Sequence, residues 1–135
     1  MDHAAVVEVT SEEEGHPIES ALVGDDKRGW RAAGTGKQTI RLIFDQPQRL
    51  KRIWLVFEES ENTRTQEFVL RSSQDQGVSF REIVRQQWNF SPPDSIREIE
   101  DYTVDLYEVT QLELIIVPDK SGSDARASLV NLRLS

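Results

Sequence analysis

The segment WNFSPPDS, which begins at Trp88, combines side chains that could bind a ligand. A tryptophan at the mouth of a loop can stack on the apolar C–H face of a sugar, while a neighbouring amide such as Asn89 binds hydroxyl groups. Aromatic residues are also enriched among those that dominate protein interfaces. The alternative is structural: Trp88 and Phe90 fold back to plug the end of the domain, and Pro92 and Pro93 end the strand. The sequence leaves both alternatives open.

Two arginines and an asparagine in other polar segments could contribute to the same kind of site. Arg64 lies with Asn62 in ESENTRTQ, and Arg126 lies in PDKSGSDAR. The guanidinium group is a rigid fork of donors that suits hydroxyl pairs and carboxylates. The alternative is that these arginines are solvated loop charges paired with Glu59, Glu61 or Asp124.

Residues that could support catalysis are few and scattered. His3 and His16 have no serine or acidic partner within a recognisable motif, and a general base needs its partner within reach. The sequence contains no cysteine, no G-x-S-x-G or H-E-x-x-H motif and no glycine-rich phosphate loop. We therefore expect a non-catalytic protein with no cofactor and no metal centre.

The overall charge and length limit the class of protein and its partners. With 16 Lys and Arg against 24 Asp and Glu, the net charge of −8 disfavours nucleic acid and anionic membranes as partners. The longest apolar run, Ile53 to Phe57, is far shorter than the ~20 residues of a membrane-spanning helix. The lack of cysteine suits a reducing compartment, and the first residues do not resemble a signal peptide. We expect a cytoplasmic protein with one domain over residues 1–135.

Alternation of apolar and polar residues predicts the elements that position these side chains. It is clear in six segments: QTIRLIFD, KRIWLVFE, EFVLRSS, DYTVDL, QLELIIV and SLVNLRL. Residues 80–87 form a weaker candidate, and residues 5–10 form a possible short strand within the partly acidic segment 1–16. About eight strands and no convincing helix indicate an all-β sandwich or barrel.

The connections between these strands alternate between short and long. The segments around Pro47-Gln48, Asp75-Gln76-Gly77 and Glu108-Val109-Thr110 are short, whereas ESENTRTQ, WNFSPPDS and PDKSGSDAR are long and polar. If consecutive strands run antiparallel, every second connection lies at the same end. The long loops, joined by RAAGTGK, are therefore predicted to gather at one end, where binding sandwiches commonly place their sites.

Four segments, in this order, carry a resemblance to a known family. They are SALVGDDKRGWRA, then IRLIFDQPQRLKRIWLVF with a proline between two strands, then EFVLRSSQDQGVSFREI, and finally YTVDLYEVTQLELIIVPD followed by SLVNLRL. Over residues 18–135 the chain resembles the discoidin family, the coagulation-factor C-type modules of galactose-binding-like fold. The resemblance implies an eight-stranded antiparallel jelly-roll β-sandwich that binds sugars, lipid head groups or proteins through loops at one end.

The chain departs from the family at its calcium site. Many sugar-binding members hold a structural calcium ahead of the tryptophan that corresponds to Trp30, which is itself expected to be structural. Three of its ligand positions correspond here to Val23, Asp25 and Arg28, and only Asp25 supplies a carboxylate. Because calcium takes six to eight oxygen ligands, we expect a calcium-independent module. The terminal disulfide of extracellular members is also absent, which fits an intracellular variant.

These observations lead to two hypotheses for the function. The first is a carbohydrate-binding module whose candidate ligand-binding residues are Trp88, Asn89, Arg64, Arg126 and Asn62. The alternative is an intracellular protein-interaction module that uses the same end of the fold. A shallow pocket with an exposed ring would favour the sugar, and a broad apolar patch would favour a protein. The sequence predicts no particular oligomeric state.

Overall fold

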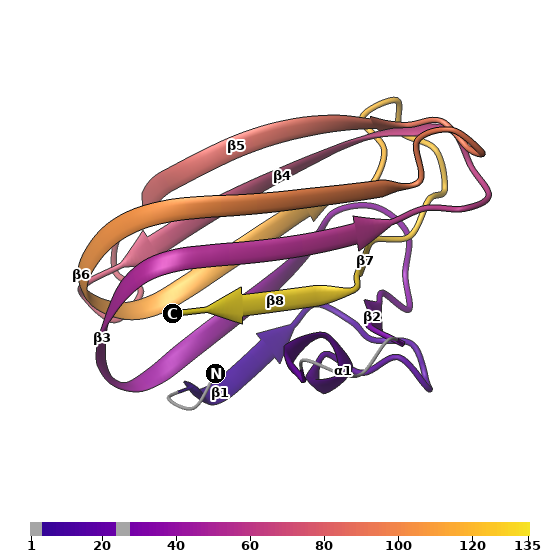
Figure 1. Cartoon of the computed structure of the whole chain (residues 1–135). Helices are drawn as coiled ribbons and strands as arrows, with labels where there is room; N and C mark the ends of the chain where they lie inside the picture. The colour runs from indigo at the N-terminus through magenta and orange to yellow at the C-terminus, as the bar shows by residue number, and fades with distance from the viewer. Residues whose placement is uncertain (1–3, 24–27) are drawn as a thin grey trace.

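Two layers of β-strands pack face to face (Figure 1). The buried apolar side chains form one core cluster between them. The structure is a computed structural model that describes residues 4–23 and 28–135. In these residues the strands pair antiparallel and the single helix has four residues. The predicted all-β antiparallel sandwich is confirmed.

The elements follow one another in the order strand, helix and then seven strands. They are β1 (Ala4–Val9), α1 (Glu19–Leu22), β2 (Trp30–Arg31), β3 (Gln38–Glu58), β4 (Arg64–Ser73), β5 (Arg81–Phe90), β6 (Arg97–Val117), β7 (Ser128–Leu129) and β8 (Asn131–Leu134). Neighbouring strands of the main sheet follow the order β1-β3-β6-β4-β5, with β8 added to β3, and β2 and β7 form a separate two-stranded ribbon. Short α1 was not predicted; it buries Ser20 and Ala21.

The long strands β3 and β6 bend together and serve both layers. Residues 38–43 of β3 pair with 111–116 of β6, and residues 52–58 of β3 pair again with 97–103 of β6. The first half of β3 also pairs with β1, whereas its second half pairs with β8. One layer therefore contains five strand segments and the other three, and both long strands curve between the layers (Figure 1).

Two of the predicted turns are bends within continuous strands. Pro47 lies inside β3 and Val109 lies inside β6, so the prediction of separate strands on either side was wrong. The register shifts between Ile43 and Arg52 absorb the bend in β3, and Glu108 turns β6 with a φ of 51°. Pairing resumes beyond both bends because the two strands bend at the same level.

The core lies between the layers, as the alternation predicted. Ile40, Leu42 and Phe44 of β3 are buried together, and residues of the opposite layer meet them. Phe57 and Phe68 come from different layers, and their rings stack with centroids 5.3 Å apart. This burial holds the two layers in a fixed relation, which in turn fixes the loops at their ends.

The long connections meet at one end of the sandwich, as the alternation of loop lengths predicted. Backbone hydrogen bonds tie them together: Glu59 N–H donates to the Ile96 carbonyl at 2.8 Å, and Lys120 N–H donates to the Thr65 carbonyl at 2.8 Å. Gly36 N–H donates to the Ala125 carbonyl at 3.2 Å. No helix in the described part of the chain is long and apolar enough to cross a membrane.

Candidate functional site

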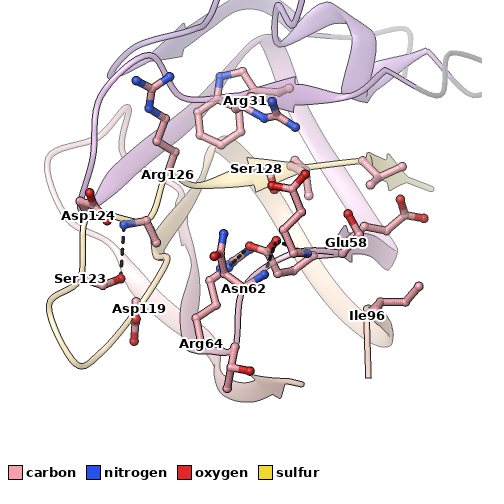
Figure 2. Close-up of a pocket in the computed structure, with 18 of the residues that line it drawn as sticks. Arg31, Glu58, Asn62, Arg64, Ile96, Asp119, Ser123, Asp124, Arg126 and Ser128 are labelled. Atoms are coloured by element: carbon pink, nitrogen blue, oxygen red, sulfur yellow. Dashed lines mark hydrogen bonds and ion pairs between the residues drawn. The ribbon is translucent and has the colours of Figure 1, made fainter. Parts of the chain in front are cut away.

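A cavity of about 620 Å³ opens among the loops at this end (Figure 2). Its walls come from three stretches far apart in the chain, residues 28–31, 58–64 and 119–130, with Ile96 at one side. Of the predicted binding residues, Asn62, Arg64 and Arg126 line this cavity. The cavity is strongly charged, because four arginines and five carboxylates line it: Arg28, Arg31, Arg64, Arg126, Glu58, Glu59, Glu61, Asp119 and Asp124.

Arg64 ties the loops of the cavity together. It begins β4, and its side chain is only 2% exposed. Its Nε donates to Glu59 at 2.7 Å, and one terminal nitrogen donates to the Pro118 carbonyl at 2.7 Å and to Gln66 at 3.1 Å. The guanidinium group also lies 4.7 Å from the centre of the Phe90 ring. The structure therefore shows the pairing with Glu59 that the alternative expected, but Arg64 is buried and not a solvated loop charge.

Glu59 organises the adjacent loop through the oxygen that Arg64 leaves available. Its second carboxylate oxygen accepts the backbone N–H groups of Glu61 at 3.1 Å and of Asn62 at 3.3 Å. Burial opposes ionisation of Glu59, but the hydrogen bonds from Arg64 and from these backbone groups outweigh it and lower its pKa. Glu59 is thus a structural anion that shapes the cavity wall.

Asp119 is also a structural anion, and it lies in the stretch 119–130 of the cavity wall. Hydrogen bonds from the Ser123 hydroxyl, and then from the backbone and side chain of Ser121, lower the pKa of Asp119 to about 2. The Ser121 backbone N–H lies 3.0 Å from an Asp119 oxygen, and its hydroxyl lies 2.8 Å away. This carboxylate fixes the turn that carries the chain towards Arg126.

The ribbon of β2 and β7 forms a further wall. Arg31 is opposite Ser128 in the ribbon, and Ala32 N–H donates to the Ala127 carbonyl at 2.9 Å. Trp30, Ala32 and Ala127 are buried in the core, so the alternating residues Arg31, Ser128 and Arg126 face away from it. All three line the cavity, with Arg31 and Arg126 along one wall in Figure 2.

Trp88 lies on the inner face of β5 and does not line the cavity. It is half-buried against the core, opposite Gln66 of β4, and its indole nitrogen is buried without a hydrogen-bond partner. Phe90, two residues along the same face, is fully buried. The structure thus places both rings where the plugging alternative expected them, with Pro92-Pro93 beyond the end of the strand.

Asn89 points to the opposite face from Trp88, also outside the cavity. It is exposed, and its side-chain oxygen accepts a hydrogen bond from the Thr65 hydroxyl at 2.8 Å. It borders a neighbouring, more open hollow together with Lys120. The five candidate residues therefore do not form one site: Asn62, Arg64 and Arg126 are together, while Trp88 and Asn89 are elsewhere.

The remaining tryptophans have structural environments. Trp30 is 1% exposed, and its indole N–H donates to the Ser11 carbonyl at 3.0 Å. Trp54 is half-buried on the outer face of the three-stranded layer, with the Arg133 guanidinium group 4.9 Å from its ring centre. Trp30 is the only aromatic residue among the described residues that line the cavity.

A buried polar chain runs inward from Arg64 and was not predicted from the sequence. Gln66 accepts from Arg64 and donates its amide to one oxygen of Glu98 at 3.2 Å. Glu98 is fully buried, and its second oxygen has no hydrogen-bond partner. Burial and the nearby Glu100 carboxylate raise the pKa of Glu98 to about 7, and the opposing effects of Gln66 and Arg64 are smaller.

The predicted absence of a calcium site stays a prediction. Asp25 lies outside the described residues, as does His3, and Val23 is half exposed. His16 contacts the Arg28 carbonyl through Nδ1 at 3.1 Å and does not line the cavity. Within residues 4–23 and 28–135, no three His, Cys, Asp or Glu side chains come together as metal ligands.

Sequence reasoning missed Arg31, Ser128 and Glu58 as cavity residues. A signal for Arg31 was present, because it follows a tryptophan expected to be buried, and alternation then turns the arginine outward. Glu58 ends β3 and lies 3.6 Å from Arg97 in an exposed ion pair. No sequence pattern marked Ser128, because its place depends on the pairing of two short strands.

Comparisons with known proteins agree with this geometry. The F5/8 type C domain model matches residues 6–99. A pectin-binding carbohydrate-binding module has 17% sequence identity and a TM-score of 0.73, over 100% of this chain and 92% of that chain. A family 32 carbohydrate-binding module of C. perfringens NanJ, in complex with galactose, has 15% identity and a TM-score of 0.71, over 96% and 91%.

A third similar structure has a protein partner. It is reduced XRCC1 bound to the DNA pol beta catalytic domain, with 15% identity and a TM-score of 0.67, over 98% of this chain and 94% of that chain. No match is found among curated proteins. At these identities the structural likeness establishes the fold, which is shared by modules that bind sugars and by a module seen with a protein.

Proposed function

This chain belongs to the F5/8 type C domain family, and from that premise we propose that it is a non-catalytic module that binds a carbohydrate in the loop-end cavity. The observation that carries the proposal is the cavity itself. Its volume of about 620 Å³ lies within the range of small-ligand sites, and hydrogen-bonding side chains line it. Two similar structures are carbohydrate-binding modules, one of them holding galactose.

The cavity residues divide into a frame and a contact set. Arg64, Glu59 and Asp119 form the frame, since hydrogen bonds within the protein occupy their side chains. Asn62 and Arg126 are exposed and form the contact set, in which the amide and the guanidinium group donate hydrogen bonds to oxygen atoms of the sugar. Trp88 and Asn89 are not part of the proposed site.

The state of the frame carboxylates supports a module without catalytic activity. Hydrolysis of a glycosidic bond needs one carboxyl group whose pKa is raised, so that it can donate a proton. The pKa values of Glu59 and Asp119 are both shifted downward, so these carboxylates stay ionised and cannot serve as the acid. Glu98 has a raised pKa but is buried and does not line the cavity.

A glycan array with a matched pair of variants tests this proposal. Asn62→Ala removes a cavity amide, and Asn89→Ala makes the same change outside the cavity. We expect the signal of the wild-type protein to fall at least several-fold for Asn62→Ala and to persist for Asn89→Ala. Melting temperatures within 2–3 °C of wild type, roughly the shift from a surface substitution, establish that both variants are folded. Loss with Asn89→Ala and retention with Asn62→Ala would move the site to the neighbouring hollow.

The second candidate function is a cytoplasmic protein-interaction module. One observation favours it: among the described residues of the cavity, no aromatic ring is exposed for a sugar to stack on. The complex that contains XRCC1 shows that a similar fold occurs with a protein partner. A blank glycan array with folded protein would favour this function. Cross-linking through a photoreactive group at position 62, followed by mass spectrometry, would then identify the partner.

A further inference from the structure

Two arginines stand side by side on the cavity wall, and no carboxylate of the described residues is hydrogen-bonded to either. Arg31 and Arg126 lie on the same face of the β2–β7 ribbon, two positions apart across the strands, with Ser128 opposite Arg31. Like charges at such neighbouring cross-strand positions repel each other. Retaining both therefore has a cost that an anionic group bound between them would offset.

The pairing of these arginines differs from that of arginines elsewhere in the protein. Among the described residues, Arg31 forms an ion pair with Glu13 only, whose oxygen is 3.7 Å from Nε and thus too far for a hydrogen bond. Within the described part of the chain, Arg126 has no hydrogen bond or ion pair. The chain has eight more acidic than basic residues, 24 against 16, so carboxylates to pair with them are not in short supply.

The rest of the cavity offers a sugar no exposed aromatic surface. Its one aromatic lining residue among those described, Trp30, is 1% exposed, so the cavity offers no ring to stack on. A neutral sugar would have to be held by hydroxyl hydrogen bonds alone. A carboxylate would instead receive charge-assisted hydrogen bonds, which are roughly twice as strong as neutral ones.

We propose that Arg31, Arg126 and Ser128 form a carboxylate subsite, and that the ligand of the cavity is a sugar bearing a carboxyl group, that is, a uronic acid. This inference rests on the proposed carbohydrate-binding function. The guanidinium groups bind the two carboxylate oxygens, and the Ser128 hydroxyl donates a further hydrogen bond. Across the cavity, the amide of Asn62 binds hydroxyl groups of the same sugar.

The net charge of the protein restricts the form of this ligand. At −8, the protein repels a long polyanion, and the repulsion decays over roughly 8 Å at physiological ionic strength. A single carboxylate placed between two arginines is attracted at much shorter range. Short oligouronides are therefore expected to bind, with less loss at high salt than for a protein that binds a polyanion along a basic surface.

Calorimetric titration with a matched pair of ligands tests the inference. The probes are trigalacturonic acid and its fully methyl-esterified form, which have the same backbone and differ in charge. We expect the acid to bind at least tenfold more tightly than the ester, as the loss of one charge-assisted contact implies. Arg126→Gln and Arg31→Gln should each weaken binding of the acid by about tenfold and change binding of the ester little.

Arg81→Gln is the matched control. Arg81 begins β5 at the opposite end of the sandwich and is exposed, so the same substitution there changes the total charge equally. We expect it to leave the affinities for both ligands within about twofold of wild type, because a distant surface charge is largely screened. An equal loss in Arg81→Gln and Arg126→Gln would overturn the subsite, since only total charge would then matter.

The remaining outcomes separate this inference from the function on which it rests. Equal affinity for the acid and the ester would overturn the carboxylate subsite and leave a carbohydrate-binding module. Binding of neither probe, together with a blank glycan array, would overturn both proposals. If a glutamate-rich peptide binds in an Arg126-dependent way while the uronide does not, the uronic-acid inference is overturned in favour of a protein partner.

Discussion

Two groups of arginines in this protein differ in what neutralises them. On the outer face of the five-stranded layer, Arg41 and Arg71 both bind the buried carboxylate of Glu113, with Arg41 donating at 3.0 and 2.7 Å. On the wall of the loop-end cavity, Arg31 and Arg126 share no such carboxylate within residues 4–23 and 28–135. The first group is neutralised by a shared carboxylate, whereas in the part of the chain that the structure describes the second group has only the longer contact of Arg31 with Glu13.

The comparison separates residues that stabilise the fold from residues available for binding. Glu113 raises the pKa of Arg41 through its hydrogen bonds, and the Phe80 ring lies 4.5 Å from the guanidinium group of Arg71. Both arginines of that cluster are held by hydrogen bonds to the same carboxylate, that of Glu113. Arg126 has no such partners in the described residues, so its removal should affect a ligand more than the fold.

Glu113→Gln is expected to have the largest effect on stability. It leaves two arginines close together on the sheet without their shared anion. Loss of a partner from a buried ion pair costs about 3–5 kcal/mol, and the partial exposure of these arginines reduces this to about 2–4 kcal/mol. Urea unfolding measures the difference. A loss below about 1 kcal/mol would mean that the cluster is no more tightly coupled than the arginines of the cavity.

Glu98→Gln should stabilise the protein in a pH-dependent way. Glu98 is a buried anion without a cation in hydrogen-bonding contact, and its pKa is raised to about 7. A raised pKa means that stability falls as the pH rises from about 4.5 to about 7 and then levels off. The variant should gain about 2–3 kcal/mol over wild type at pH 8 and little at pH 4.5.

Thermal unfolding from pH 4.5 to pH 8 checks the prediction for Glu98. The diagnostic result is a difference between the two proteins that grows with pH and reaches a plateau above neutrality. A constant difference across this range would show that Glu98 keeps one protonation state throughout, in contradiction to its raised pKa.

Asp101→Asn is expected to have a small effect, although its geometry resembles that of Glu113. Arg52 donates to both oxygens of Asp101 at 2.8 and 2.7 Å, but both side chains are about half exposed. Exposed pairs contribute roughly 0.2–1 kcal/mol because water already solvates both charges. The same urea experiment, run beside Glu113→Gln, tests whether burial rather than geometry sets the cost. Equal losses in the two variants would contradict that view.

Arg126→Gln should have the smallest effect on stability, within about 0.5 kcal/mol of wild type. Its side chain is exposed and, in the described residues, makes no ion pair. The free energy of unfolding by urea, measured without ligand, is the relevant quantity. A loss as large as that of Glu113→Gln would show that Arg126 has a structural partner, and the distinction between the two arginine groups would no longer hold.

Much of the fold could be predicted from the sequence, because its signals are local. Alternation in QTIRLIFD and QLELIIV placed Ile40, Leu42, Leu114 and Ile116 in the core, where the structure has them. Loop length and antiparallel order predicted the end at which the long loops gather. The bends in β3 and β6 could not be predicted, because they depend on the pairing of the two strands with each other.

The site was harder to predict, since it depends on which way individual side chains turn. Trp88 was a candidate for ligand contact, yet it shares a face with Phe90, and two-residue alternation turns both inward. Arg64 was expected in a loop, but it begins a strand, and its side chain enters the protein to meet Glu59 and Pro118. The pairing with nearby Glu59 was an alternative that the sequence offered, but the contact with Pro118 joins distant segments and leaves no mark in the local sequence.

The double pairing of β3 and β6 has a consequence for the way the domain unfolds. Each long strand contributes backbone hydrogen bonds to both layers, on either side of its bend. One layer cannot detach without removing strands from the other, so neither is an independent unit of stability. Loss of structure is therefore an all-or-none event for the whole sandwich. The loops that form the cavity are attached to both layers and unfold together with them.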